Sequence, residues 1–153
     1  MITKNDAFGL SCALTTPFRE NGGVDVERMI RHAQTCLREG CSSVTVFGTT
    51  GEGASFGMDE RAKTVAAFKD AGFDVRRTLI GGVASASLDD AVSQTAMLVD
   101  ADCRAILLTP PFYFKGVSDD GLFAWFSALF EKLGARARDV ILYNIPSVTA
   151  VPL

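Results

Sequence analysis

The sequence predicts an α/β fold, namely the first part of a (β/α)₈ barrel, and three observations lead to this prediction. Continuous apolar runs alternate with segments whose apolar residues recur at helical spacing. The runs begin about every 30 residues, which is the length of one βα unit. Each run is apolar throughout, as in parallel strands that are covered on both faces. We therefore expect residues 1–153 to form one domain with five strands and four helices. An open doubly wound sheet would fit these observations too, and the loops described below favour the N-terminal portion of one barrel domain.

The apolar runs give the expected strands at residues 10–15, 43–47, 78–83, 105–109 and 140–144. Asp25 should accept a hydrogen bond from a free amide at the start of the first helix. Gly40 should end that helix, because glycine readily adopts the left-handed turn that follows one. The apolar positions of this helix share one face: Val26, Met29, Ile30, Ala33 and Leu37.

The second helix is expected to begin near Gly57. Asp59 and Glu60 lie in its first turn, where acidic side chains favour the positive end of the helix dipole. Its buried face is expected to contain Ala62, Val65 and Ala66.

Two further helices have clear starting signals. Ser87, with Asp90 three residues later, forms an acidic variant of the capping box. Ser118, followed by two aspartates, opens the last helix. The expected apolar faces are Leu88, Ala91, Val92, Thr95, Ala96 and Val99 for the third helix, and Leu122, Trp125, Phe126, Leu129 and Leu133 for the fourth.

The loops between the elements distinguish a barrel from an open doubly wound sheet. A dinucleotide-binding sheet would carry Gly-x-Gly-x-x-Gly after its first strand, where this chain has Thr-Pro-Phe at residues 16–18. Polar motifs instead follow successive strands, as in barrels whose site gathers residues from several strand ends. The pattern favours the barrel.

Composition excludes several classes of function. Fifteen basic and eighteen acidic residues give a net charge of −3, without the clustered basic excess typical of nucleic-acid binding. No apolar run approaches the roughly 20 residues of a membrane span, and residues 1–6 do not resemble a secretion signal. We therefore expect a cytoplasmic protein that binds neither nucleic acid nor a membrane.

The cysteines and the single histidine do not form a metal-binding pattern. Cys12, Cys36, Cys41 and Cys103 contain no Cys-x-x-Cys pair, so we expect free thiols and no metal site. His32 lies off the apolar face of the first helix and is expected to be exposed.

Three loop motifs contain the candidate functional residues. Residues 48–53 (Gly-Thr-Thr-Gly-Glu-Gly) offer hydroxyls and accessible amides for a carboxylate or phosphate, although a simple tight turn explains them equally well. In residues 109–113 (Thr-Pro-Pro-Phe-Tyr), Tyr113 is either a positioned hydroxyl or a packed aromatic. In residues 143–147 (Tyr-Asn-Ile-Pro-Ser), Tyr143 is either a proton relay or a tyrosine of the barrel core.

These three motifs, in this order on the second, fourth and fifth strands, resemble the dihydrodipicolinate synthase / N-acetylneuraminate lyase family. Its members are pyruvate-dependent class I aldolases with a (β/α)₈ barrel. The resemblance extends from about Gly9 to Ser147, and three motifs in register are far more specific than any one of them.

The resemblance implies a Schiff-base mechanism and no separate cofactor. A lysine amine would form an imine with pyruvate or another 2-oxo acid. Thr50, with Gly48 and Gly51, would hold the carboxylate, and Tyr143 would move protons. Thr49 would link Tyr143 to Tyr113, which in the family reaches across a subunit interface. The resemblance thus implies a homodimer or homotetramer.

Two differences from the family pattern affect the expected activity. The imine-forming lysine of the family lies one βα unit beyond the tyrosine, and therefore beyond Leu153 here. The lysines of this chain lie in the N-terminal tail, on helices or in a loop: Lys4, Lys63, Lys69, Lys115 and Lys132. Val148 occupies the position where dihydrodipicolinate synthases carry a carboxylate-binding arginine. We expect the chain alone to be inactive. Val148 leaves the second substrate open, and another aldehyde or 2-oxo acid, as for a sugar-acid aldolase or dehydratase, fits at least as well as that of lysine biosynthesis.

Two other functions compete with the lyase. A half-barrel without its lysine would act as a binding or regulatory module. A nucleotide-dependent oxidoreductase or kinase is disfavoured, because neither a dinucleotide fingerprint after the first strand nor a P-loop motif is present.

Overall fold

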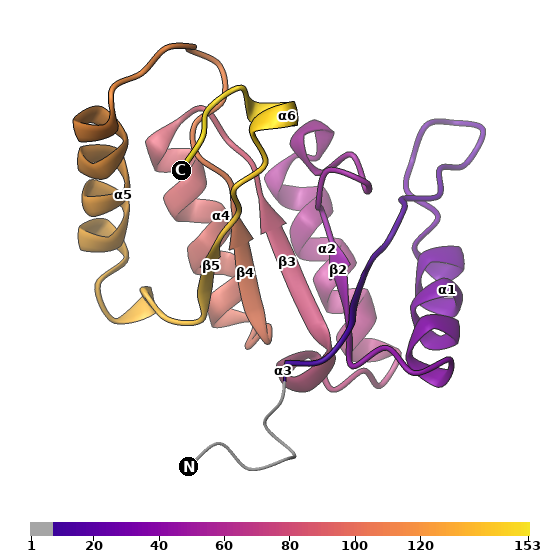
Figure 1. The fold of residues 1–153 in the computed structure, drawn as a ribbon. Coiled ribbons are helices and arrows are strands. Elements are labelled where there is room, and N and C mark those ends of the chain that lie inside the picture. Colours follow the sequence, from indigo (N-terminus) through magenta and orange to yellow (C-terminus); the bar gives the residue numbers. More distant parts are fainter. Residues whose placement is uncertain (1–7) are drawn as a thin grey trace.

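The strands form one parallel sheet in the order in which they occur along the chain (Figure 1). The computed structural model describes residues 8–153. Each strand pairs with the next one, whereas a doubly wound sheet reverses direction partway. This order confirms the barrel-type topology. The strands are β1 (Ser11–Ala13), β2 (Ser43–Val46), β3 (Leu79–Val83), β4 (Ala105–Leu108) and β5 (Val140–Leu142).

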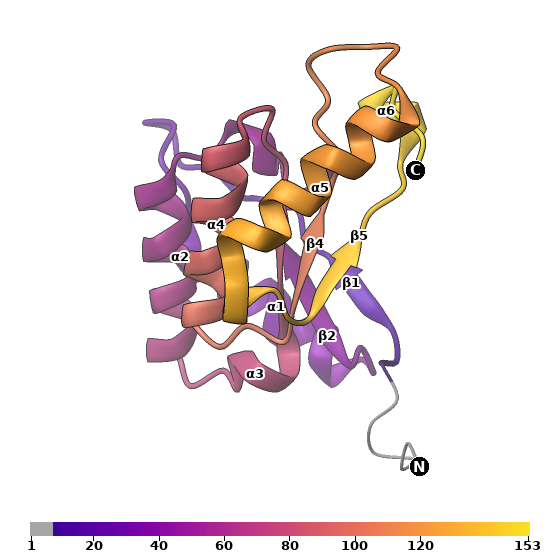
Figure 2. The same cartoon turned by 90° about the vertical axis from the view of Figure 1, so that its left-hand side faces the viewer.

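Four long helices connect these strands, as expected from the sequence. Figure 2 shows α2, α4 and α5 on one side of a curved sheet, and neighbouring helices pack against one another. The long helices are α1 (Val26–Arg38), α2 (Met58–Asp70), α4 (Leu88–Asp100) and α5 (Asp119–Leu133). The short helices α3 (Val75–Thr78) and α6 (Pro146–Thr149) were not expected, nor were the 3₁₀ turns η1 (Gly53–Ser55) and η2 (Gly134–Arg136).

The helix starts confirm the expected caps. Asp25 accepts a hydrogen bond from the Arg28 amide at 3.0 Å. Ser87 accepts one from the Asp90 amide at 3.3 Å, and Ser118 accepts one at 3.1 Å from the amide three residues later. These bonds satisfy amides that have no partner inside the helix, and so they set where each helix begins.

The buried face of α2 differs from the expected one. Ala62 and Ala66 are exposed. The buried positions are Arg61, Thr64, Val65 and Phe68, which lie at offsets 0, 3, 4 and 7. Burying the Phe68 ring removes far more apolar surface from water than burying two methyl groups, so the helix turns this face inward. Arg61 lies on the same face.

The two faces of the sheet have different environments. Gly81 packs directly on α4, where an added Cβ would lie 2.4 Å from a Leu98 methyl carbon. On the opposite face, side chains from all five strands line an inner cavity of about 270 Å³. Ser11 Oγ and Thr45 Oγ1 are 3.0 Å apart there. The strand residues of this inner cavity are Ser11, Ala13, Thr45, Ile80, Leu107 and Ile141.

Several expectations concern the chain ends and the cysteines. The N-terminal segment 1–6, with Lys4, lies outside the described residues. From residue 8 onward, no helix is long and apolar enough to cross a bilayer. All four cysteines are free thiols, and the sulfur atoms of Cys12 and Cys36 are 3.6 Å apart.

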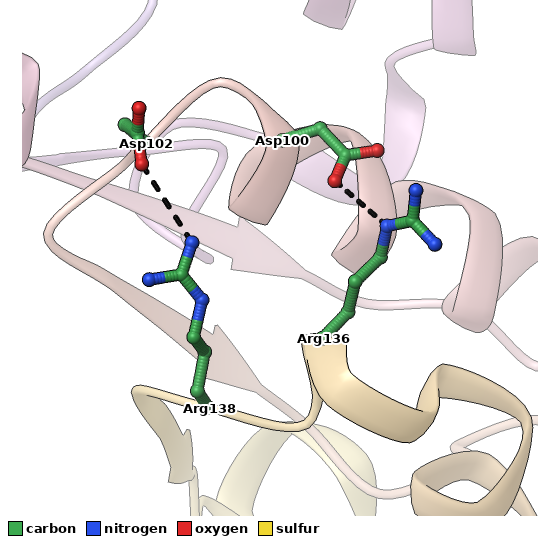
Figure 3. A network of polar contacts seen from close by, with 4 residues as sticks. All are labelled: Asp100, Asp102, Arg136 and Arg138. Atoms are coloured by element: carbon green, nitrogen blue, oxygen red, sulfur yellow. Dashed lines mark hydrogen bonds and ion pairs between the residues drawn. The ribbon is translucent and has the colours of Figure 1, made fainter.

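Two ion pairs fasten the end of α4 to the connection that leads into β5 (Figure 3). Arg136 Nε donates to Asp100 Oδ1 at 2.7 Å. Arg138 Nη2 lies 3.6 Å from Asp102 Oδ1. The hydrogen bond from Arg136 holds the pKa of the Asp100 carboxyl below its ordinary value. The pairs therefore help to position the strand that leads to Tyr143.

Changing Arg136 to Gln should raise the pKa of Asp100 toward its ordinary value, as measured by NMR titration of the carboxyl group. Arg138→Gln is the matched control, and it should raise this pKa less, because Arg138 acts on Asp100 only through space. The folded-state pKa is lowered, so the stabilisation is present above the ordinary pKa and is lost as pH falls through the lowered one. If the pKa of Asp100 is the same in Arg136→Gln as in wild type, the hydrogen bond from Arg136 is not what lowers it.

Candidate active site

The loop after β2 is held in one shape by hydrogen bonds from its own backbone and from β1. The Gly48 carbonyl accepts from the amides of Gly51 and Gly53, at 3.1 and 3.0 Å. Thr16 Oγ1, just after β1, donates to the Gly51 carbonyl at 2.7 Å. A Cβ at Gly51 would lie 2.7 Å from the Leu14 carbonyl oxygen, so only glycine fits. The conformation of this loop, at the carboxyl end of the sheet, is therefore fixed by its hydrogen bonds and by the close approach at Gly51.

This loop leaves two adjacent amides without partners. Within residues 8–153, the amides of Thr49 and Thr50 make no hydrogen bond, and neither side-chain hydroxyl makes one. Both residues are exposed. Thr50 lines the inner cavity, and Thr49 lines both the inner cavity and a second one of about 200 Å³. Unpaired amides beside hydroxyls form a set of donors suited to an anionic group.

Tyr143 lines the same cavities from the end of the edge strand β5. It directly follows β5, and its amide donates to the Leu108 carbonyl at 2.7 Å. Tyr143 is half-buried and lines both cavities together with Thr49. Its hydroxyl has no hydrogen-bond partner in the described part of the chain. We name the second cavity the site cavity; it is also lined by Phe47, Gly48, Glu52, Gly82, Thr109 and Val148.

Tyr113 lies apart from Thr49 and Tyr143. It is 70% exposed, and its ring packs edge-on against Phe114, with centroids 5.0 Å apart. It lines a different cavity, of about 220 Å³, with Val117 and Trp125. The structure thus brings five of the six expected site residues together and leaves Tyr113 on an exposed aromatic surface.

Arg61 lies beneath the loop and was not expected from the sequence. Its side chain is 0% exposed. Nη1 donates to the Gly82 carbonyl at 2.8 Å, Nη2 donates to the Gly53 carbonyl, and Nε donates to the Phe56 carbonyl at 3.3 Å. Burial lowers the pKa of the guanidinium to about 10, so it remains charged at neutral pH. The signal in the sequence was its place at helical spacing with Thr64, Val65 and Phe68.

Comparison with known proteins gives the family. The model of the dihydrodipicolinate synthetase family matches residues 6–153. The chain belongs to this family. An uncharacterised DapA-like lyase of Chloroflexus aurantiacus is 36% identical over 95% of this chain and 48% of that protein. A 4-hydroxy-tetrahydrodipicolinate synthase of Agrobacterium fabrum is 33% identical over 92% of this chain and 46% of that protein. A 2-dehydro-3-deoxy-phosphogluconate/2-dehydro-3-deoxy-6-phosphogalactonate aldolase of Saccharolobus solfataricus is 31% identical over 89% of this chain and 44% of that protein.

Solved structures agree with this assignment. Dihydrodipicolinate synthase from Agrobacterium tumefaciens str. C58 superposes with a TM-score of 0.93 at 56% identity, over 96% of this chain and 51% of that one. A variant of Sulfolobus solfataricus 2-keto-3-deoxygluconate aldolase gives a TM-score of 0.80 at 28% identity, over 94% of this chain and 47% of that one. The chain spans about half the length of the family members that it matches.

In this member of the dihydrodipicolinate synthetase family, no lysine among residues 8–153 lines the inner cavity or the site cavity. Lys63, Lys69 and Lys132 are exposed on helices. Lys115 lies in the loop after β4, where its Nζ donates to the carbonyls of Phe112 and Thr149. The Lys115 amine therefore ties the loop after β4 to the end of α6 (Pro146–Thr149).

Two further observations concern ligands. Val148 is 55% exposed and lines the site cavity, so no guanidinium fork is present at that position. His32 is exposed on α1, as expected. Among residues 8–153, no group of three or more His, Cys, Asp or Glu side chains is arranged to hold a metal ion.

Proposed function

We propose that the full-length protein is a Schiff-base lyase that acts on pyruvate and an aldehyde, or on a longer 2-oxo acid. The observation that carries the proposal is that Thr49, Thr50 and Tyr143 line one cavity at the carboxyl ends of the strands, with unpaired amides and free hydroxyls. Family membership and the lyases and aldolases among the relatives support it.

In this proposal the loop after β2 binds the carboxylate of the substrate. The amides of Thr49 and Thr50, the Thr50 hydroxyl, and the tight turn made by Gly48 and Gly51 form the cradle. A carboxylate needs several donors on its two oxygens, and this loop has donors that no other group uses. Thr49 lines both cavities together with Tyr143, and we assign to it the role of orienting the phenol.

Tyr143 moves protons between the amine nitrogen and the carbonyl oxygen while the imine forms. The lysine amine attacks the ketone of pyruvate, the carbonyl oxygen leaves as water, and a C=N bond forms. The phenol donates a proton to the departing oxygen and receives one from the attacking amine. It later passes a proton to or from the second substrate. We place the amine on a lysine outside residues 1–153 and take this chain as the N-terminal portion of one barrel domain.

Val148 bears on the second substrate. A valine at this position offers no donor to a distal carboxylate, whereas an arginine would offer two charge-assisted hydrogen bonds. The second substrate is therefore an aldehyde or 2-oxo acid that is not recognised through a carboxylate at this point. A sugar-acid aldolase or dehydratase fits at least as well as lysine biosynthesis.

The protein acts as a cytoplasmic homodimer or homotetramer. Tyr113 and Phe114 are 70% and 74% exposed, and a second copy would cover this aromatic surface and bring Tyr113 into the neighbouring site. The four free thiols support a reducing compartment.

Incubating the full-length protein with pyruvate and borohydride tests the proposal. Intact mass should rise by one pyruvate, less one water, plus two hydrogens, and borohydride alone should give no change. Peptide mapping should place the adduct outside residues 1–153. No adduct would favour the binding-module alternative, and an adduct on Lys115 would contradict the proposed position of the amine. Thr50→Val should raise the pyruvate concentration needed for half-maximal labelling.

A further inference from the structure

Arg61 is the largest fully buried side chain of the described residues, and it has no acidic partner. A buried guanidinium ordinarily pairs with a carboxylate, because the cost of removing its charge from water must be offset. Here three backbone carbonyls replace the carboxylate. The arrangement leaves a net positive charge behind the loop.

The carbonyls that Arg61 binds belong to two neighbouring parts of the sheet. Gly53 closes the loop after β2, and Gly82 lies in β3, the next strand of the sheet. The guanidinium thus fastens the loop to the neighbouring strand. Its Cζ also lies 4.8 Å from the centre of the Phe47 ring, at the start of the loop.

The loop needs such fastening because its backbone is strained at both ends. Phe47 and Glu52 have φ of 59° and 57°, in the left-handed region that residues with a Cβ rarely adopt. Each such residue costs about 1 kcal/mol or more, and it persists only where the surroundings determine it. The free amides of Thr49 and Thr50 lie between these two residues.

We propose that Arg61 is a positioning residue of the carboxylate-binding loop, which acts through the backbone carbonyls of Gly53 and Gly82 and through its buried positive charge. This inference rests on the proposed function, because it assigns Arg61 to the binding of the pyruvate carboxylate. Arg61 touches no substrate. It sets the direction of the Thr49 and Thr50 amides and makes the loop more attractive to an anion.

Arg61→Lys tests the inference in the full-length protein. Lysine keeps the charge but has one donor atom in place of the planar fork, so it cannot reach all three carbonyls. The readouts are the pyruvate concentration for half-maximal borohydride labelling and the maximal labelling rate. We expect the half-saturating concentration to rise about tenfold, with the maximal rate within about threefold of wild type, as for the loss of binding alone.

Phe68→Leu is the matched control. Phe68 is buried on the same face of α2, about two turns further from the loop, and it packs against Phe73. This change should lower the melting temperature and leave the half-saturating concentration unchanged. If both variants raise that concentration equally, Arg61 is merely structural and the inference is wrong.

A second variant decides the matter if Arg61→Lys does not fold. Phe47→Leu removes the ring under the guanidinium and leaves its hydrogen bonds in place. It should raise the half-saturating concentration about threefold, a smaller effect than full loss of the fork. An unchanged concentration in the folded variant would overturn the inference. Absence of an adduct in the wild type would instead overturn the proposed function itself, together with the inference.

Discussion

Replacing Tyr143 with Phe in the full-length protein is expected to slow proton transfer about a hundredfold or more, the usual contribution of a positioned acid–base group. The measurement is exchange of the pyruvate methyl protons with deuterium from solvent, followed by NMR, which needs no second substrate. The change removes one oxygen atom, and that hydroxyl has no partner among residues 8–153, so folding should be unaffected.

Thr45→Val is the matched control for this experiment. Thr45 also lines the inner cavity, but its hydroxyl pairs with Ser11 Oγ at 3.0 Å on the inner face of the sheet. Its removal should lower stability while leaving the exchange rate within about threefold of wild type. Equal rates for wild type and Tyr143→Phe would remove the proton relay from the mechanism.

Gly53→Ala should cost at least about 3 kcal/mol of folding stability, the upper range for forcing extra atoms into a packed interior. A Cβ at Gly53 would lie 1.8 Å from the Phe47 carbonyl oxygen, and this contact is with backbone, which cannot rotate away. Either the loop shifts or the Arg61 hydrogen bond to the Gly53 carbonyl breaks. Urea unfolding of the full-length protein measures the loss.

Gly48→Ala provides the comparison within the same loop. A Cβ there would lie 3.7 Å from the nearest atom, a Thr45 methyl carbon, which is an ordinary contact. Neither glycine has a positive φ, so the two substitutions differ in the space available. We expect Gly48→Ala to change stability by less than about 1 kcal/mol. Similar losses for both variants would show that space is not the deciding factor.

The strand order and the four long helices could be predicted because the evidence for each was local. Asp25, Ser87 and Ser118 carry side chains that cap a helix, and the apolar runs mark strands without reference to the rest of the chain. The short helices α3 and α6 were missed, because four residues are too few to show a period. Only Pro146, at the first position of α6, gave a signal.

The role of Arg61 could not be predicted in the same way. Arginine on a helix ordinarily faces water, and its partners here are backbone carbonyls, which leave no trace in the identity of residues. For Tyr113 the sequence identified the residue but not its position. Its motif was recognised, yet only the fold shows that it lies on an exposed surface away from Tyr143.

The unbroken strand order also has a consequence for the way the protein forms. From β2 to β5, each strand pairs with the strand synthesised just before it, and α2, α4 and α5 each pack beside the long helix that precedes them. Within residues 8–153, none of β2 to β5 has to wait for a later segment before one of its edges is paired. The sheet can therefore grow by one βα unit at a time as the chain leaves the ribosome, with the newest edge always ready for the next strand.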